Sequence, residues 1–344
     1  MVLAGHDNKA ATQAARNTGI PLVQLQPALA SHGLFTAAPS HSLSAAAFLS
    51  PPSAAATAMN GLTDTCLVLH TTGTTGTKKK VCYTMEQLLV GALCVAKSRR
   101  LEPDTLALSM LPLHHVAGVM RALALQLLGG SLVFSGAFDA NFFWWTLQNY
   151  TVGYVAATPT MLQACVSDGK RMRFSKGLHA IATVESVGGP LPSTLAVDLA
   201  AWFSATILQG YALTECMPVT CPPASTSLIR PGSVGVPVGP TVAVLGDDGD
   251  VRSLNASGEI LLRGKPLFRG YEGGSGSSGS SVDAEGWFHT GDLGHVDSEG
   301  FVFITGRAKV RPCVHQPNNP FVRPQSKPVG SWRLRCVVEL VNTL

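Results

Sequence analysis

Hydroxyl-bearing residues, glycines and lysines gather between residues 70 and 80, in the run HTTGTTGTKKK. Glycine lets backbone N–H groups approach phosphate oxygens, threonine hydroxyls add donors, and lysine neutralises charge. The run therefore predicts a phosphate-binding loop. It is not a Walker A loop, because the pattern counted from Gly73 needs a second glycine where Lys78 stands, and this disfavours a P-loop kinase. On composition alone, a solvated turn with a basic tail is the alternative.

The elements that would position this loop alternate between strands and helices. Short apolar runs, typical of strands, separate segments whose apolar residues recur with helical spacing. One helix should begin at Thr84, because Gln87 follows at the spacing of a capping box. This alternation indicates βαβ units and a mostly parallel sheet. Strands are predicted at 66–70, 106–112, 131–134, 152–158, 179–186 and 205–211, and helices at 84–97, 120–130, 142–150, 159–166 and 191–203.

After Gly232 the sequence changes to short strands with tight turns, at 235–239, 241–251 and 258–264. The predicted fold class is therefore α/β, with mostly parallel sheets, flanking helices and a small antiparallel β sub-barrel. An Ala/Ser/Pro-rich stretch from Ala30 to Gly61 predicts a loose connection. The expected parts are residues 1–231 (α/β), 232–309 (sub-barrel) and 310–344, a tail without periodicity that is expected to be disordered.

Composition narrows the classes of protein. Hydrophobic residues make up 46% of the 344 and charged residues 13%, which argues against a disordered chain. A net charge of +4 is mild and argues against a nucleic-acid surface. The eight cysteines form no C-x-x-C pair, which favours buried reduced thiols in a cytoplasmic protein. We see no secretory signal, no apolar run of membrane-spanning length and no peroxisomal address in the C-terminal NTL.

Six blocks occur in an order that is typical of one family. They read LHTTGTTGTKKKV, LPLHHVAGV, VGGPLP, QGYALTE, GWFHTGDLG and GFVFITGRAK. Together they resemble the adenylate-forming (AMP-binding) superfamily of acyl-CoA synthetases, luciferases and peptide-synthetase adenylation domains. The resemblance runs from the region of Asn8 to Lys309. RPGSVGVPVG and GYALTEC are similar to the wording of oxalate–CoA ligase-like members.

The resemblance implies a role for the phosphate loop. Its members would wrap the β- and γ-phosphates of ATP, with Lys79 at the position of the family's loop lysine. Thr75 and Glu215 would approach Mg²⁺, a hard cation that prefers oxygen ligands. Without its neighbours, Glu215 would be read as a surface carboxylate after a strand. The loop residues so assigned are Thr71, Thr72, Gly73, Thr74, Thr75 and Gly76.

The same resemblance implies a nucleoside site. Tyr211 would stack on adenine, and Asp292 would accept both ribose hydroxyls with its two oxygens. Taken singly, Tyr211 is more often a buried core residue and Asp292 a turn aspartate. Arg307 would help to fix ribose and phosphate, and Lys309 sits where the family places its interdomain hinge. The remaining members of the implied site are Gly188, Gly189, Pro190, Gly210 and Thr214.

His115 matches the histidine that gates the family's acyl pocket, so Lys79, His115 and Glu215 are the expected catalytic residues. The neighbouring His114 suggests a zinc alternative. We disfavour zinc because adjacent residues on a strand point to opposite faces.

The implied reaction joins a small carboxylic acid to coenzyme A. The acid and MgATP would give an acyl-adenylate and pyrophosphate, and CoA would then form a thioester. After Lys309 the wording of the family's lid is lost, and the amino end looks shortened. A chain truncated at both ends with impaired turnover is therefore expected. Within the loop, Lys78 and Lys80 replace the family's usual Pro and Gly.

Two alternatives stay open. One is a non-catalytic module that binds ATP or an adenylate. The other is a hydroxycinnamate or medium-chain acid as substrate, since Ala117 stands where oxalate-type members carry a second histidine. Charged residues in the acid pocket would mark a dicarboxylate, and an apolar lining would mark the other acids.

Overall fold

The computed structural model describes residues 2–5, 22–27, 35–39, 61–72, 78–134, 138–172, 181–223, 230–272 and 282–308. The chain falls into two units, residues 1–60 and residues 61–344. In the first unit, β1 (Val2–Gly5) pairs with β2 (Leu22–Pro27) in parallel, and β2 pairs with β3 (Phe35–Pro39) in antiparallel fashion. The expectation of a loose connection over Ala30–Gly61 is wrong at β3.

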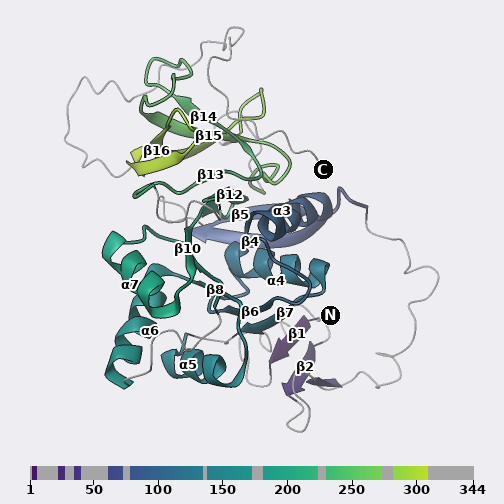
Figure 1. Cartoon of the computed structure of the whole chain (residues 1–344). Helices are drawn as coiled ribbons and strands as arrows, with labels where there is room; N and C mark the ends of the chain where they lie inside the picture. Colours follow the sequence, from purple (N-terminus) through teal and green to yellow (C-terminus); the bar gives the residue numbers. More distant parts are fainter. Residues whose placement is uncertain are drawn as a thin grey trace. The chain divides into compact units, whose positions relative to one another are not determined.

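The second unit is built around a five-stranded sheet, which Figure 1 shows with helices packed beside it. Its strand order is β10-β9-β8-β6-β7, and all neighbours are parallel. Its strands are β6 (Leu106–Ser109), β7 (Ser131–Phe134), β8 (Tyr154–Ala157), β9 (Thr183–Ser186) and β10 (Thr206–Gln209). The helices between them are α4 (Val116–Leu128), α5 (Ala140–Asn149), α6 (Pro159–Met172) and α7 (Ser193–Phe203). The predicted α/β class with a parallel sheet is confirmed.

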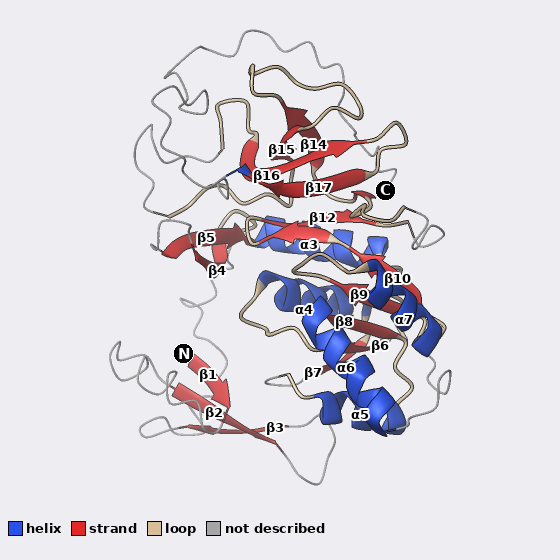
Figure 2. Ribbon diagram, turned by 90° about the vertical axis from the view of Figure 1, so that its left-hand side faces the viewer, coloured by secondary structure: helices blue, strands red, loops and turns tan. Residues whose placement is uncertain are grey.

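Helices cover both faces of this sheet, so alternate strand residues enter different cores. Ala107 and Tyr154 pack with side chains of α4 and of α3 (Met85–Ser98). Leu108 and Val155 pack with side chains of α5, α6 and α7, the helices that Figure 2 shows beside this sheet. A sheet buried on both faces needs apolar residues at consecutive positions, as these strands have.

Local signals explain where several elements begin and end. The predicted capping box at the start of α3 is confirmed, because Thr84 Oγ1 accepts from the Gln87 N–H at 3.3 Å and Gln87 Oε1 accepts from the Thr84 N–H at 2.9 Å. Helix α4 ends at Gly129, whose φ of +82° is left-handed and favours glycine. It begins at Val116, four residues before the predicted start at Met120.

Antiparallel strands make up the rest of the described part. The strand β4 (Thr65–Thr72) pairs with β5 (Lys78–Thr84), which sequence analysis missed. Val81 and Tyr83 of β5 are fully buried, whereas Lys80 is exposed, so buried and exposed side chains do alternate along this part of β5. A three-stranded sheet contains β11 (Tyr211–Leu213), β12 (Cys216–Cys221) and β13 (Val236–Pro237). A four-stranded sheet contains β14 (Thr241–Leu245), β15 (Gly258–Arg263), β16 (Phe288–Val296) and β17 (Val302–Arg307).

The four-stranded antiparallel sheet after Gly232 agrees with the predicted change of texture. The expected boundary between residues 231 and 232 stays a prediction, and residues 310–344 lie outside the described residues. Over the ranges that the structure describes, no helix has both the length and the apolarity that crossing a membrane requires.

Candidate functional site

Several predicted site residues lie where parallel strands end. Gly188, Gly189 and Pro190 follow β9, and Gly210 and Tyr211 follow β10. Because β9 and β10 are parallel neighbours, their carboxyl ends share one edge of the sheet, and the Gly210 N–H donates to the Ser186 carbonyl at 3.3 Å. The carboxyl ends of the strands are the side of the sheet on which open α/β folds bind ligands.

Two of these glycines are required by the backbone. Gly188 has a φ of +87°, in the left-handed region that side chains disfavour. At Gly210, an added Cβ would lie 3.1 Å from Nη2 of Arg99 and 3.1 Å from the carbonyl of Thr220. A larger residue at position 210 would therefore push against a buried side chain and a neighbouring strand.

Asp292 joins three segments that are distant in sequence. Its Oδ2 accepts from the Tyr211 hydroxyl at 2.5 Å, and its Oδ1 accepts from Nε of Arg307 at 2.6 Å. Asp292 and Arg307 are register partners on β16 and β17, which places the guanidinium beside the carboxylate. Burial raises the pKa of Tyr211, and the charge of Asp292 raises it further. The Tyr211 hydroxyl therefore stays a proton donor, and the carboxylate stays fixed between two donors.

The turn that presents Asp292 is held by its own neighbours. Oε1 of Glu259 accepts from the Gly291 N–H at 2.9 Å, and Oε2 lies 3.1 Å from Nδ1 of His289. The Thr290 hydroxyl donates to the Ile260 carbonyl and accepts from the Asp292 N–H at 3.0 Å. These contacts link the block HTGD to β15, so the position of Asp292 is set from more than one side.

A second cluster contains Lys79 and Glu215. The hydroxyl of Tyr271 donates to Oε1 of Glu215 at 2.5 Å, and Nζ of Lys79 lies 4.5 Å from the centroid of the Tyr271 ring. Glu215 and Thr214 form the turn between β11 and β12, and the Thr214 carbonyl accepts from the Tyr83 hydroxyl at 2.7 Å. Tyr271 was not predicted as a site residue, and nothing in the run FRGYEGG singles it out.

The two clusters share an electrostatic environment. The hydrogen bond to Asp292 raises the pKa of Arg307, and the negative charges of Asp292 and Glu215 add to this effect. The charge of Glu215 thus acts on the guanidinium of Arg307, and the assignment of both clusters to one nucleotide site stays a prediction.

The β4–β5 hairpin pairs the residues at the two ends of the predicted phosphate loop. Thr71 pairs with Lys79, and Thr72 pairs with Lys78. Gly73, Thr74, Thr75 and Gly76 lie outside the described residues, as does Lys309. The structure therefore places the two ends of the loop, and the loop assignments themselves stay predictions.

The donor set around Glu215 fits magnesium. Mg²⁺ is commonly held by one or two carboxylates together with substrate phosphates. Glu215 supplies one carboxylate, which is 9% exposed, and its Oε1 accepts a hydrogen bond from the Tyr271 hydroxyl. Within the described ranges, no group of three or more His, Cys, Asp or Glu side chains is arranged to hold a metal ion. The protein thus offers few ligands, and a bound nucleotide would have to supply others.

The prediction that His114 and His115 point to opposite faces of a strand is wrong. They lie in the turn between β6 and α4, not on a strand, and His115 is the residue immediately before α4. Their ring centroids are 4.7 Å apart with a tilt of 41°. The prediction failed because a turn does not alternate as a strand does. The backbone N–H of His115 donates to the Pro112 carbonyl at 3.1 Å, and its carbonyl accepts from the N–H groups of Gly118 and Val119. The role of His115 at the acid pocket stays a prediction.

A buried ionic network next to Gly210 was also missed. Arg99 donates to Oε1 of Glu185 at 3.1 and 2.8 Å through Nε and Nη2, and Arg121 donates to Oε2 at 2.8 Å. The Tyr154 hydroxyl donates to the same carboxylate. Burial opposes ionisation of Glu185, but Arg121 and Arg99 outweigh it, and its pKa falls to about 2. The sequence did carry a signal, since a charged residue inside an apolar strand or helix needs a partner.

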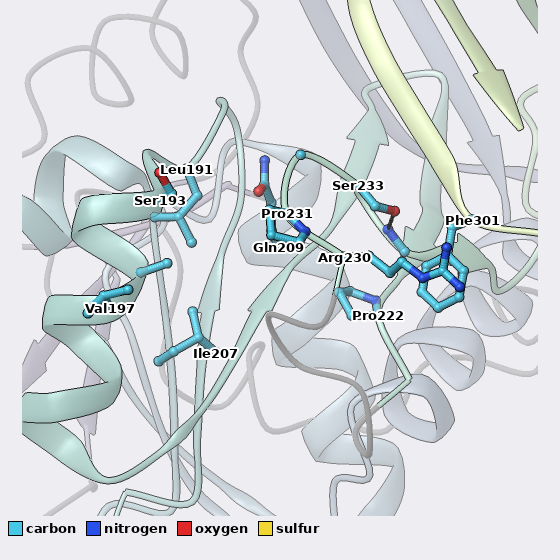
Figure 3. A pocket seen from close by; sticks show the side chains of 13 residues that line it. Leu191, Ser193, Val197, Ile207, Gln209, Pro222, Arg230, Pro231, Ser233 and Phe301 are labelled. Carbon is cyan, nitrogen blue, oxygen red and sulfur yellow. Dashed lines mark hydrogen bonds between the residues drawn. The ribbon is translucent and has the colours of Figure 1, made fainter. Parts of the chain in front are cut away.

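A cavity of about 140 Å³ lies beside β10 (Figure 3). Ile207 and Gln209 of β10 line it together with Ser193 and Val197 of α7, and Arg230 stacks 4.9 Å from the centroid of the Phe301 ring on another side. The cavity contains none of the predicted site residues. Gln209 nevertheless directly precedes Gly210 and Tyr211, so its amide is a further candidate that sequence analysis missed.

Comparisons with known proteins identify the family of the chain. The sequence profile described as AMP-binding enzyme matches residues 4–272. Oxalate–CoA ligase of Arabidopsis thaliana is 30% identical over 251 residues, which are 72% of this chain and 48% of that protein. Feruloyl-CoA synthase of an Amycolatopsis species is 32% identical over 255 residues, 72% of this chain and 50% of that protein. The chain spans about half the length of the curated relatives it matches.

Solved structures show the same fold. The N-terminal domain of FACL13 from Mycobacterium tuberculosis, with an inhibitor bound, has a TM-score of 0.73 at 26% identity and covers 89% of this chain and 74% of that one. O-succinylbenzoate CoA synthetase (MenE) from Bacillus subtilis, in complex with ATP and magnesium ion, has a TM-score of 0.65 at 25% identity, over 72% of this chain and 51% of that one.

Proposed function

The chain belongs to the AMP-binding enzyme family, and from this membership we propose that it is the ATP- and acid-binding part of an acid–CoA ligase. The observation that carries the proposal is the meeting of Tyr211 and Arg307 at the carboxylate of Asp292. Three segments supply this cluster, and each contains a residue for which the sequence predicts a nucleotide contact.

In the proposed reaction, a carboxylate oxygen of the acid attacks the α-phosphorus of ATP. A new phosphorus–oxygen bond forms while the bond to the bridging oxygen of the β-phosphate breaks, which releases pyrophosphate and leaves an acyl-adenylate. The thiolate of CoA then attacks the acyl carbon, and AMP leaves with the electron pair of the broken bond. The protein must align the acid with phosphorus and neutralise charge there.

The nucleoside would be held by the first cluster. Asp292 would accept from the ribose hydroxyls with its remaining lone pairs, while Tyr211 would offer its ring face to adenine. Gln209 lines the cavity beside β10 and is joined to Tyr211 only through the chain. We include its amide as a candidate because its donors and acceptor would match the amino group and ring nitrogen of adenine. Gly188, Gly189, Pro190 and Gly210 would supply backbone around the base.

The phosphates would be held by the second cluster. Lys79 and the loop that begins at Thr71 would contact the phosphates, with Glu215 and Thr75 holding Mg²⁺. When bound, Mg²⁺ would neutralise phosphate charge. His115, in the turn after β6, would gate the entry of the acid.

For the acid, we propose oxalate or a similar small carboxylate, supported by the oxalate–CoA ligases among the relatives. Hydroxycinnamates and medium-chain acids are the competing class, because a feruloyl-CoA synthase is also a relative. Acid-dependent exchange between ATP and labelled pyrophosphate on the purified chain, measured with each acid in turn, separates these substrates.

The same experiment separates function from binding alone. Exchange with one acid class supports adenylation by this chain, whether or not a thioester forms with added CoA. Absence of exchange together with ATP binding in calorimetry would favour a non-catalytic nucleotide-binding module. Absence of both would overturn the proposed function.

A further inference from the structure

Tyr271 contacts both candidate phosphate-site residues with one side chain. Its hydroxyl donates to Oε1 of Glu215 at 2.5 Å, and its ring faces Nζ of Lys79 at 4.5 Å from the centroid. A cation over an aromatic face is attracted by the negative charge of the ring face. The lysine and the carboxylate are therefore held on the same aromatic group.

The backbone around Tyr271 fixes this geometry. Tyr271 forms an antiparallel bridge with Val81 of β5, and the Glu272 N–H donates to the Lys80 carbonyl at 3.1 Å. On the other side, the Phe268 N–H donates to the Glu215 carbonyl at 2.9 Å, and the rings of Phe268 and Tyr271 pack edge to face at 4.9 Å. The segment 267–272 thus spans from the β11–β12 turn to β5.

The hydroxyl of Tyr271 also restricts how Glu215 can bind a cation. With one oxygen accepting from Tyr271, the carboxylate is oriented to present its second oxygen. Mg²⁺ takes carboxylates in tight octahedral geometry, whereas Ca²⁺ readily accepts both oxygens of one carboxylate. A carboxylate fixed through Oε1 therefore favours Mg²⁺ over Ca²⁺.

We propose that Tyr271 is a positioning residue, and this proposal rests on the proposed function. By donating to Oε1 of Glu215, Tyr271 orients the other carboxylate oxygen toward Mg²⁺, and its ring holds Lys79 beside the same site. It acts through these two residues and does not itself touch the reacting atoms. Its hydroxyl sets the metal dependence of ATP binding, and its ring sets the position of the lysine.

The test compares Tyr271→Phe with Tyr271→Leu in the full chain. Tyr271→Phe keeps the ring under Lys79 and removes the hydroxyl, whereas Tyr271→Leu removes both. ATP binding is measured by calorimetry without divalent cation and in titrations with MgCl₂ or CaCl₂. For Tyr271→Phe we expect unchanged binding of metal-free ATP, a roughly five- to tenfold higher Mg²⁺ concentration at half-maximal binding, and a smaller preference for Mg²⁺ over Ca²⁺. For Tyr271→Leu, binding of metal-free ATP should weaken as well.

Tyr83→Phe is the matched control. Tyr83 also donates to the β11–β12 turn, but to the Thr214 carbonyl at 2.7 Å and not to the carboxylate. If Tyr83→Phe shifts the Mg²⁺ dependence as much as Tyr271→Phe does, general loosening of the turn explains the effect and the proposal fails. Wild-type Mg²⁺ and Ca²⁺ dependence in a folded Tyr271→Phe variant also overturns it, while leaving the proposed function intact. Failure of the wild-type chain to bind ATP overturns the proposed function itself.

Discussion

The hydroxyl of Tyr211 donates a 2.5 Å hydrogen bond to Oδ2 of Asp292, which lies 81 positions further along the chain. Arg307 donates to the other oxygen of the same carboxylate at 2.6 Å. A carboxylate has about four lone-pair sites, so two donors leave room for two more. Substitutions at Tyr211, Asp292 or Arg307 should therefore change the affinity for the nucleoside before they change other properties.

Asp292→Asn should raise the Kd of ATP roughly tenfold or more, because a hydrogen bond to a charged group contributes about 1.5–3 kcal/mol. Calorimetric titration with ATP measures the change. Titration with 2′-deoxy-ATP provides the control, since the wild-type preference for ATP over the deoxynucleotide should shrink in the variant. Equal discrimination by both proteins would contradict a ribose contact at Asp292.

Tyr211→Phe and Tyr211→Leu separate the hydroxyl from the ring. Stacking of a base on an aromatic side chain contributes about 1–3 kcal/mol, so Tyr211→Leu should weaken ATP binding more than Tyr211→Phe does. Burial and then Asp292 raise the pKa of Tyr211 above its usual value of 10.0. Wild-type ATP affinity should therefore show no loss from tyrosine ionisation up to pH 10. Identical affinities of the two variants would argue against stacking.

Glu185→Gln should destabilise the fold by ~3–5 kcal/mol, because it leaves Arg99 and Arg121 buried without their anion. The free energy of unfolding in urea measures the loss. Lys170→Ala is the matched control, since Lys170 pairs with Asp198 at 2.8 Å but both side chains are about half exposed. An exposed pair contributes about 0–1 kcal/mol, so equal losses would refute the importance of burial.

The contribution of Glu185 to the free energy of unfolding should be lost over a defined range of acidic pH. Its pKa is lowered from 4.5 to about 2, since the attraction of Arg121 and Arg99 exceeds the effect of burial. A lowered pKa in the folded state means that the stabilisation is complete above about pH 4.5 and is lost as pH falls toward 2. Unfolding curves of wild type and Glu185→Gln should therefore converge as pH falls through this window. A constant difference would exclude ionisation as the cause.

Gln209→Leu should raise the Kd of ATP about two- to tenfold, as expected for a hydrogen bond that contributes about 0.5–1.5 kcal/mol. The relative affinity for GTP should improve, because a leucine no longer selects the edge of adenine. Val197→Leu is the control, since Val197 lines the same cavity from α7. An equal effect of both substitutions would assign the change to the volume of the cavity and not to the amide.

The sequence was sufficient for the family and for the alternation of strands and helices, because apolar periodicity and turn chemistry are local. Strand β5 was missed, since three lysines at 78–80 obscured an alternation that becomes clear only once Val81 and Tyr83 are seen to be buried. The turn position of His114 and His115 was missed because an apolar run gives no signal of where a strand stops.

The contacts within the site could be predicted only in part. Tyr211, Glu215 and Asp292 stand in recognisable blocks, but their partners depend on how distant segments meet. Tyr271 reaches Glu215 across 56 positions, and no local pattern encodes such a distance. The Glu185 network was predictable in principle from charge inside apolar segments, although the identity of each partner was not.

The order of the strands in the parallel sheet indicates where the proposed carboxylic acid substrate would bind. From β6 the chain passes through α4 to the edge strand β7, whereas from β8 it proceeds through α6 and β9 to β10 at the opposite edge. Adjacent strands whose connections diverge form a topological switch point, outside whose carboxyl ends open α/β sheets bind ligands, and β6 and β8 are such a pair. His115 follows β6 at this point, and Thr158 follows β8. We therefore expect substitutions at His115 and Thr158 to change which acid the proposed ligase accepts, whereas the position of the switch point depends only on the order of the strands.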